Sequence, residues 1–272
     1  MRDASPRSRG RLARLCLWLA VSSFVLAAAR PSIEIDPPRR PGILELVVDT
    51  SGSTAAGDIA PTRFAAIQEV TTGLLDRIPA DLRVGLVTFS SEAATLASPT
   101  TDRDLIRREI RSQQPTGGTA MGDALQRALD DIRATRPAAP AAILLLSDGA
   151  NANGRDPLAS AQALAAQHVP VLAIAVGTPD GVLHPPAALK TLRPQRVPPD
   201  PAQLASIAGR TGGRIIEARS AADLKDAVHS LLDGAGLLTA RQELTGLFVA
   251  ASLLLALGAL LSRPRRPASG MR

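Results

Sequence analysis

Between residues 40 and 235, short runs of mostly apolar residues alternate with segments in which apolar residues recur every three or four positions. The runs predict buried strands, because a strand covered on both faces is apolar at nearly every position; they lie at 43–48, 83–89, 141–146 and 171–176. The segments at helical spacing predict helices over 61–78, 102–111, 121–132, 157–167, 201–209 and 221–232, with a short strand at 214–216. This alternation predicts an α/β fold: a doubly wound, mostly parallel sheet with helices on both faces. The proline-rich stretch 178–199 has no period and predicts an excursion over the surface.

Two apolar segments flank this region. Leu244 to Leu261 comprises 18 residues without a charge. At about 1.5 Å per residue this length approaches the hydrocarbon thickness of a bilayer, so a transmembrane helix is predicted at 244–261. Residues 15–29 form a shorter apolar segment that follows basic residues and ends in Ala27-Ala28-Ala29. It fits either an uncleaved membrane anchor or a cleavable signal peptide.

The positive charge of the chain is concentrated at its ends. The formal net charge is +6, but residues 1–14 and residues 262–272 each contribute +4, which leaves −2 for the remainder. Basic tails outside both apolar segments predict a cell-membrane protein, with a lipid bilayer as its surroundings and both termini in the cytoplasm. The domain at 42–235, which follows a proline-rich linker at 30–41, is then expected to be extracytoplasmic.

Composition excludes several kinds of site. The single cysteine, Cys16, excludes an intramolecular disulfide and a thiolate metal cluster. The folded part is slightly acidic, and four Phe, one Trp and no Tyr offer little surface for base stacking, so nucleic-acid binding is not expected.

Candidate metal ligands lie in three loops at the ends of predicted strands or the start of a predicted helix. Asp49-Thr50-Ser51-Gly52-Ser53 follows the strand 43–48, Thr119 precedes the helix 121–132, and Asp148 follows the strand 141–146. Parallel strands end at the same edge of a sheet, so the two aspartates are expected to approach each other. Carboxylate and hydroxyl oxygens suit Mg2+ or Mn2+. The predicted ligand set is Asp49, Ser51, Ser53, Thr119 and Asp148.

These five residues match the metal-ion-dependent adhesion site (MIDAS) of the von Willebrand factor A (VWA) domain at every position: Asp-x-Ser-x-Ser, then a threonine, then an aspartate. Segments 60–64, 83–89, 176–179 and 211–214, together with the C-terminal apolar segment, further resemble bacterial membrane-anchored proteins of the aerotolerance (Bat) type. The resemblance implies a Rossmann-like VWA fold. It also implies hydroxyl ligation by Ser51, Ser53 and Thr119, with Asp49 and Asp148 binding directly or through water.

In that family an open coordination position accepts an acidic side chain from a partner protein. Bat-like proteins are often encoded beside MoxR-type AAA+ ATPases, so the resemblance implies a role in envelope protein assembly or stress tolerance.

Other functions are weighed against this one. The metal could merely staple the three loops of a structural membrane protein. A haloacid-dehalogenase-like phosphotransferase also begins with a strand and an aspartate, although Ser51 stands where it would need a second aspartate. The histidines His168, His184 and His229 pair with no evident nucleophile, and no P-loop or dinucleotide fingerprint occurs. The protein is therefore expected not to be an enzyme.

Overall fold

The computed structural model describes residues 18–23, 25, 32–34, 42–135, 140–185, 193–234, 241–243 and 245–261. The chain divides into two compact units, Pro38–Leu238 and a unit formed by Met1–Pro37 with Thr239–Arg272. In the smaller unit, strands β1 (Ser32–Glu34) and β10 (Arg241–Glu243) pair antiparallel, and helix α8 spans Thr245–Leu261.

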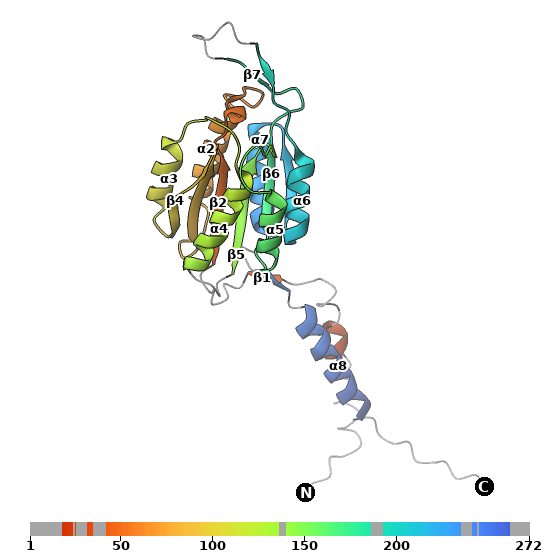
Figure 1. Cartoon of the computed structure of the whole chain (residues 1–272). Coiled ribbons are helices and arrows are strands. Elements are labelled where there is room, and N and C mark those ends of the chain that lie inside the picture. The colour runs from red at the N-terminus through yellow and green to blue at the C-terminus, as the bar shows by residue number, and fades with distance from the viewer. Residues whose placement is uncertain are drawn as a thin grey trace, which may run out of the picture. The chain divides into compact units, whose positions relative to one another are not determined.

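A six-stranded sheet forms the centre of the larger unit (Figure 1). The order is β4-β3-β2-β5-β6-β9, and every neighbouring pair is parallel except β3 and β4. The strands are β2 (Ile43–Asp49), β3 (Arg83–Phe89), β4 (Ala93–Thr100), β5 (Ala141–Ser147), β6 (Val171–Val176) and β9 (Arg214–Ala218). The predicted mostly parallel α/β sheet is confirmed.

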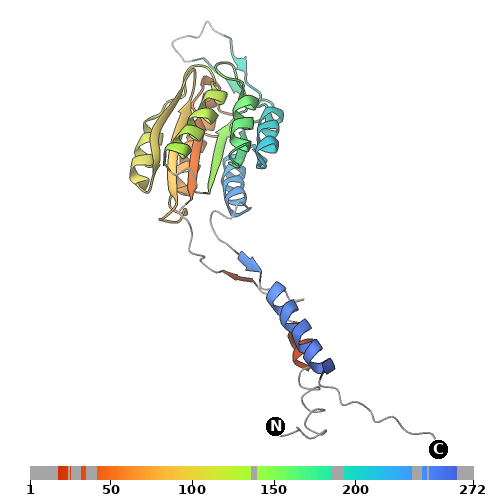
Figure 2. The same ribbon diagram turned by 60° about the horizontal axis from the view of Figure 1, so that its bottom comes forward.

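Helices cover both faces of this sheet (Figure 2). Residues Leu44, Leu46 and Val48 of β2 share one apolar core with helices α2 (Arg63–Leu74), α3 (Arg103–Ser112) and α7 (Ala221–Gly234). Ile43 and Val47, which point the other way, share the second core with α4 (Met121–Thr135), α5 (Pro157–Ala165) and α6 (Pro201–Thr211). All seven residues of β2 are therefore buried.

Strand β4 is the one strand of the central sheet that the sequence pattern did not predict. It lies at the sheet edge, antiparallel to β3, and only Ala97 and Pro99 of its residues are buried. An edge strand needs no continuous apolar run, and it tolerates a proline because one side of its backbone has no strand to pair with.

Helix α2 starts two residues later than the pattern predicted. Its N-cap is Thr62, whose Oγ1 accepts a hydrogen bond from the Ala65 amide at 3.1 Å, so Pro61 lies outside the helix. The helix ends at Leu74, and Ile78, expected on its apolar face, is buried beyond its end. The cap fixes where the neighbouring residue Arg63 enters the domain.

The structure corrects one expectation about the flanking segments. Over the residues it describes, no helix is long and apolar enough to cross a membrane. Helix α8 has 17 residues. The transmembrane helix predicted at 244–261 is therefore not found among the described residues. Of the segment 15–29, predicted as a membrane anchor or a signal peptide, only residues 18–23 and 25 are described. The tails 1–14 and 262–272, and parts of 15–29 and 30–41, lie outside the described residues.

The chain makes an excursion between β6 and α6. It contains the short antiparallel strands β7 (Val182–Leu183) and β8 (Gln195–Arg196), and Figure 1 shows it at the end of the domain where the parallel strands finish. Residues 186–192 lie outside the described part of the chain.

Candidate metal centre

The strand order brings Asp49 and Asp148 together. Strand β2 comes first in the domain and lies between β3 and β5, so the chain winds outward in one direction through β3 and in the other through β5. At such a switch point the connections diverge and leave a crevice at the carboxyl ends of the strands. Asp49 is the last residue of β2, and Asp148 directly follows β5.

Backbone hydrogen bonds join the three loops that carry the predicted ligands. The loop after β2 makes two such bonds with residues 116–117, at 2.8 and 3.1 Å. The Thr119 carbonyl accepts bonds from the amides of Ala152 and Asn153, at 2.9 and 3.1 Å, in the loop that follows Asp148. The elements that hold the predicted ligands therefore form one connected edge.

Two hydroxyls of this edge, Ser51 Oγ and Ser53 Oγ, share a hydrogen bond of 3.0 Å, a spacing that also suits two ligands of a small cation. Neighbouring ligands of an octahedral Mg2+, bound at about 2.1 Å, are separated by about 3.0 Å. Ser51 and Thr119 are buried, whereas Ser53 is partly exposed, so the site opens to solvent on the Ser53 side.

Asp49 is buried and rigidly held. Its Oδ1 accepts a hydrogen bond from the Ser51 amide at 2.8 Å, and its Oδ2 accepts one from Ser147 Oγ at 2.5 Å. Burial raises the pKa of Asp49 to about 7, and the nearby charge of Asp148 adds to this, against the hydrogen bonds from Ser147 and Ser51. The protein alone therefore provides too little positive charge near Asp49 to stabilise its ionised carboxylate.

The donor set fits a hard divalent cation. The two buried aspartates, Asp49 and Asp148, together carry a charge of −2 when ionised, which one divalent ion neutralises. Within the described residues there is no cluster of three or more His, Cys, Asp or Glu side chains. Two carboxylates with serine and threonine hydroxyls give an all-oxygen set, which suits Mg2+ or Mn2+ rather than the nitrogen and sulfur ligands that zinc prefers.

Two residues beside the site were missed in the sequence. Arg63 is completely buried and donates from Nη1 to Asp148 Oδ2 at 3.2 Å. Its Nε and Nη2 donate to the two carboxylate oxygens of Asp58, each at 2.8 Å. A signal was present, because residues 63, 67, 70 and 74 lie on the same face of α2 and the last three are apolar. An arginine in line with an apolar stripe indicates a buried acidic partner.

Asp58 stays ionised because of these contacts. Burial alone would raise its pKa, but hydrogen bonds from Arg63 and Thr178, together with the Arg63 charge, outweigh it and lower the pKa to about 2. Arg63 and Asp58 thus form a neutral pair next to the Asp148 carboxylate.

Comparisons with known proteins show the family and the fold of this chain. A family model for the von Willebrand factor type A domain matches residues 44–151. A UPF0353 protein of Mycolicibacterium vanbaalenii is 31% identical over 273 residues, which cover 94% of this chain and 80% of that protein. The chain belongs to the UPF0353 family. A second UPF0353 protein, from Mycobacterium tuberculosis, is 30% identical over 262 residues, covering 90% of this chain and 76% of that protein.

Solved structures show that this UPF0353 protein has the VWA fold. An aerotolerance-related membrane protein from Bacteroides fragilis aligns with a TM-score of 0.63 and 21% identity, over 71% of this chain and 99% of that chain. Proximal thread matrix protein 1 from the mussel byssus, with a zinc-occupied MIDAS motif, aligns with a TM-score of 0.57 and 19% identity, over 79% of this chain and 50% of that one. The expected VWA domain is confirmed by the family model and by these shared folds.

Proposed function

We propose that this protein binds a divalent cation, Mg2+ or Mn2+, and uses it to dock an acidic side chain of a partner protein. The hydroxyls of Ser51, Ser53 and Thr119 would hold the ion, and Asp49 and Asp148 would balance its charge. The 3.0 Å spacing of the two serine hydroxyls beside a buried pair of aspartates is the observation that carries the proposal. No catalytic role is proposed, because His168, His184 and His229 hydrogen-bond to none of these residues in the described structure.

Docking is favoured over stapling by the backbone contacts of the site. The loops after β2, before α4 and after β5 are already joined by four backbone hydrogen bonds, which need no cation. A cation there would add little to holding the loops together. The partly exposed Ser53 side leaves room for an incoming carboxylate, which would pair with the bound positive charge.

Adding Mg2+ to the purified protein is expected to raise its melting temperature. At a hundredfold excess over the dissociation constant, binding linkage contributes about 2.7 kcal/mol, or about 5–10 °C for a domain of this size. Asp49→Ala is expected to abolish the shift. Asp180→Ala removes the same charge from a side chain that is 94% exposed, and it is expected to keep the shift. Equal responses of both variants would place the ion elsewhere.

Docking has its own test. The protein is mixed with a polypeptide rich in aspartate and glutamate, and retention is measured with Mg2+ and with a chelator. Retention is expected with the metal alone, and its loss is expected in Asp49→Ala. Capture that continues unchanged in chelator would refute docking while leaving the metal site intact.

The location and the cellular system are separate proposals carried by sequence patterns. The arginine-rich tails and apolar segments favour an extracytoplasmic domain with cytoplasmic termini. The resemblance to Bat proteins favours a role in envelope protein assembly or stress tolerance, together with a MoxR-type AAA+ ATPase. External protease added to intact cells is expected to cut within 178–199. Resistance of that segment in intact cells, with cleavage after lysis, would place the domain inside.

A further inference from the structure

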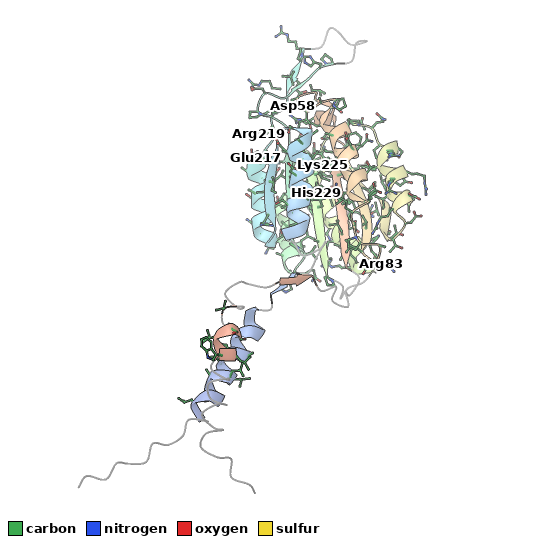
Figure 3. The ribbon with its side chains drawn as sticks, turned by 180° about the vertical axis from the view of Figure 1, so that it is seen from behind. Asp58, Arg83, Glu217, Arg219, Lys225 and His229 are labelled. Atoms are coloured by element: carbon green, nitrogen blue, oxygen red, sulfur yellow. The ribbon has the colours of Figure 1, made fainter. Side chains whose placement is uncertain are left out.

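Both ends of the 177–200 excursion are fixed to residues beside the metal site. At the first end, the amide and Oγ1 of Thr178 donate to Asp58 Oδ2 at 2.7 and 3.0 Å. At the second end, the Val197 carbonyl accepts from Arg63 Nη2 at 2.8 Å, and the Asp200 amide donates to the Asp148 carbonyl at 2.6 Å. Figure 3 labels Asp58 at the end of the domain from which the excursion projects.

The excursion is packed closely around the guanidinium of Arg63. A Cβ atom added at Gly177 would come within 2.6 Å of Arg63 Cζ, and one added at Gly181 would come within 2.0 Å of Nη2. Gly177 also has a φ of +133°, which side chains other than hydrogen rarely allow. Arg63 is therefore enclosed by the start of the excursion, and any movement of its side chain must move that backbone.

Arg63 can position Asp148 without repelling a cation. Its charge is balanced by the paired hydrogen bonds to Asp58, so the pair as a whole is neutral. Its third nitrogen holds Asp148 Oδ2, while the Ala150 amide donates to Oδ1 at 3.2 Å. These two hydrogen bonds favour one orientation of the carboxylate before an ion binds, so less freedom is lost on binding.

We propose that Arg63 is a positioning residue that couples cation binding at Asp148 to the anchoring of the 177–200 excursion. The inference rests on the proposed metal site. A bound cation fixes Asp148, Asp148 fixes Arg63, and Arg63 with Asp58 fixes both ends of the excursion. Since coupling free energy is reciprocal, loosening the excursion must also weaken cation binding.

The test measures Mg2+ affinity by calorimetry and amide exchange by mass spectrometry in the full-length protein. In the unmodified protein, Mg2+ is expected to slow exchange at Thr178 and Val197 by at least about fivefold. Arg63→Lys keeps the positive charge, but a lysine lacks the planar guanidinium group that bonds to Asp58 and Asp148 together. It is expected to bind Mg2+ at least about fivefold more weakly and to lose the exchange response.

Thr178→Val tests the coupling from a position that touches no proposed ligand. It removes only the hydroxyl contact to Asp58, and it is expected to weaken Mg2+ binding measurably. Thr72→Val is the matched control, because it also removes one threonine hydroxyl, whose hydrogen bonds go to the Gln68 and Glu69 carbonyls of its own helix. It is expected to bind Mg2+ as the unmodified protein does.

The outcomes separate the two proposals. If the unmodified protein binds no Mg2+, the proposed function fails and the coupling fails with it. If Mg2+ binds but exchange at Thr178 and Val197 is unchanged, the metal site stands and the coupling is refuted. Equal affinities of Thr178→Val and Thr72→Val also refute the coupling, even if Arg63→Lys does not fold.

Discussion

Replacing Glu45 with methionine is expected to raise the free energy of unfolding at neutral pH by about 2–4 kcal/mol, because a buried polar group without a partner costs about 1–3 kcal/mol, and more when charged. Glu45 lies in the middle of the central strand β2 and is fully buried. Within the described residues, neither of its carboxylate oxygens has a hydrogen-bond partner. Methionine fills a similar elongated space without a polar atom.

The effect of Glu45 depends on pH. Burial raises the pKa of its carboxyl group well above the usual 4.5, and the charge of Asp131 on α4 raises it further. The folded protein therefore holds a proton that the unfolded chain releases. The stability this proton provides is complete below about pH 4.5, and it is lost as the pH rises through the raised pKa of the folded state.

Glu45→Gln separates the cost of burying a polar group without a partner from the cost of ionising it. It keeps the shape of the side chain but cannot ionise, so it is expected to lose the pH dependence while gaining less stability than Glu45→Met. Urea denaturation of all three proteins is compared across the acid and neutral range. Parallel pH curves for the unmodified protein and Glu45→Gln would contradict a raised pKa.

The neighbouring strand supplies a further check on the position of Glu45. The carboxylate lies over Gly85, where an added Cβ would meet Glu45 Oε2 at 2.1 Å. Gly85→Ala is therefore expected to destabilise the unmodified protein but to cost less when Glu45 is shortened to alanine. Additive effects of the two substitutions would mean that the side chains are not in contact.

Asp49→Asn is expected to stabilise the protein in chelator by roughly 2–4 kcal/mol while abolishing its stabilisation by Mg2+. In the absence of a cation, burial disfavours the charge of Asp49, and the nearby charge of Asp148 disfavours it further. Asparagine carries no charge and can keep both contacts: its oxygen accepts from the Ser51 amide, and its NH2 group donates to Ser147 Oγ. Thermal denaturation with Mg2+ and with chelator measures both effects.

Asp148→Asn is the control for Asp49→Asn, because it neutralises the other carboxylate of the pair. Asp148 already receives a hydrogen bond from Arg63, so neutralising it removes a favourable contact together with the repulsion. Its gain in chelator is expected to be smaller than that of Asp49→Asn. If Asp49→Asn instead destabilises the metal-free protein, the two carboxylates do not repel each other as the structure indicates.

Much of the site could be predicted because its residues follow local signals. Asp49 and Asp148 each come at the end of a mostly apolar strand, and Thr119 precedes a helix with clear apolar spacing. Sequence spacing alone could not show that the hydroxyls of Ser51 and Ser53 lie next to each other. Their proximity depends on how the loop after β2 turns through the short 3-10 helix Gly52–Ala55.

By itself, the sequence determined the alternation of strands and helices and the five candidate ligands, because apolar period and Asp-x-Ser-x-Ser spacing are properties of neighbouring residues. Only the tertiary structure decided that β4 closes the sheet edge, that Glu45 is buried and that Arg63 joins Asp58 to Asp148. Residues 63 and 148 are 85 positions apart, and Glu45 is buried by helix α4, more than 70 positions away. Such contacts follow from the strand order, which no local pattern encodes.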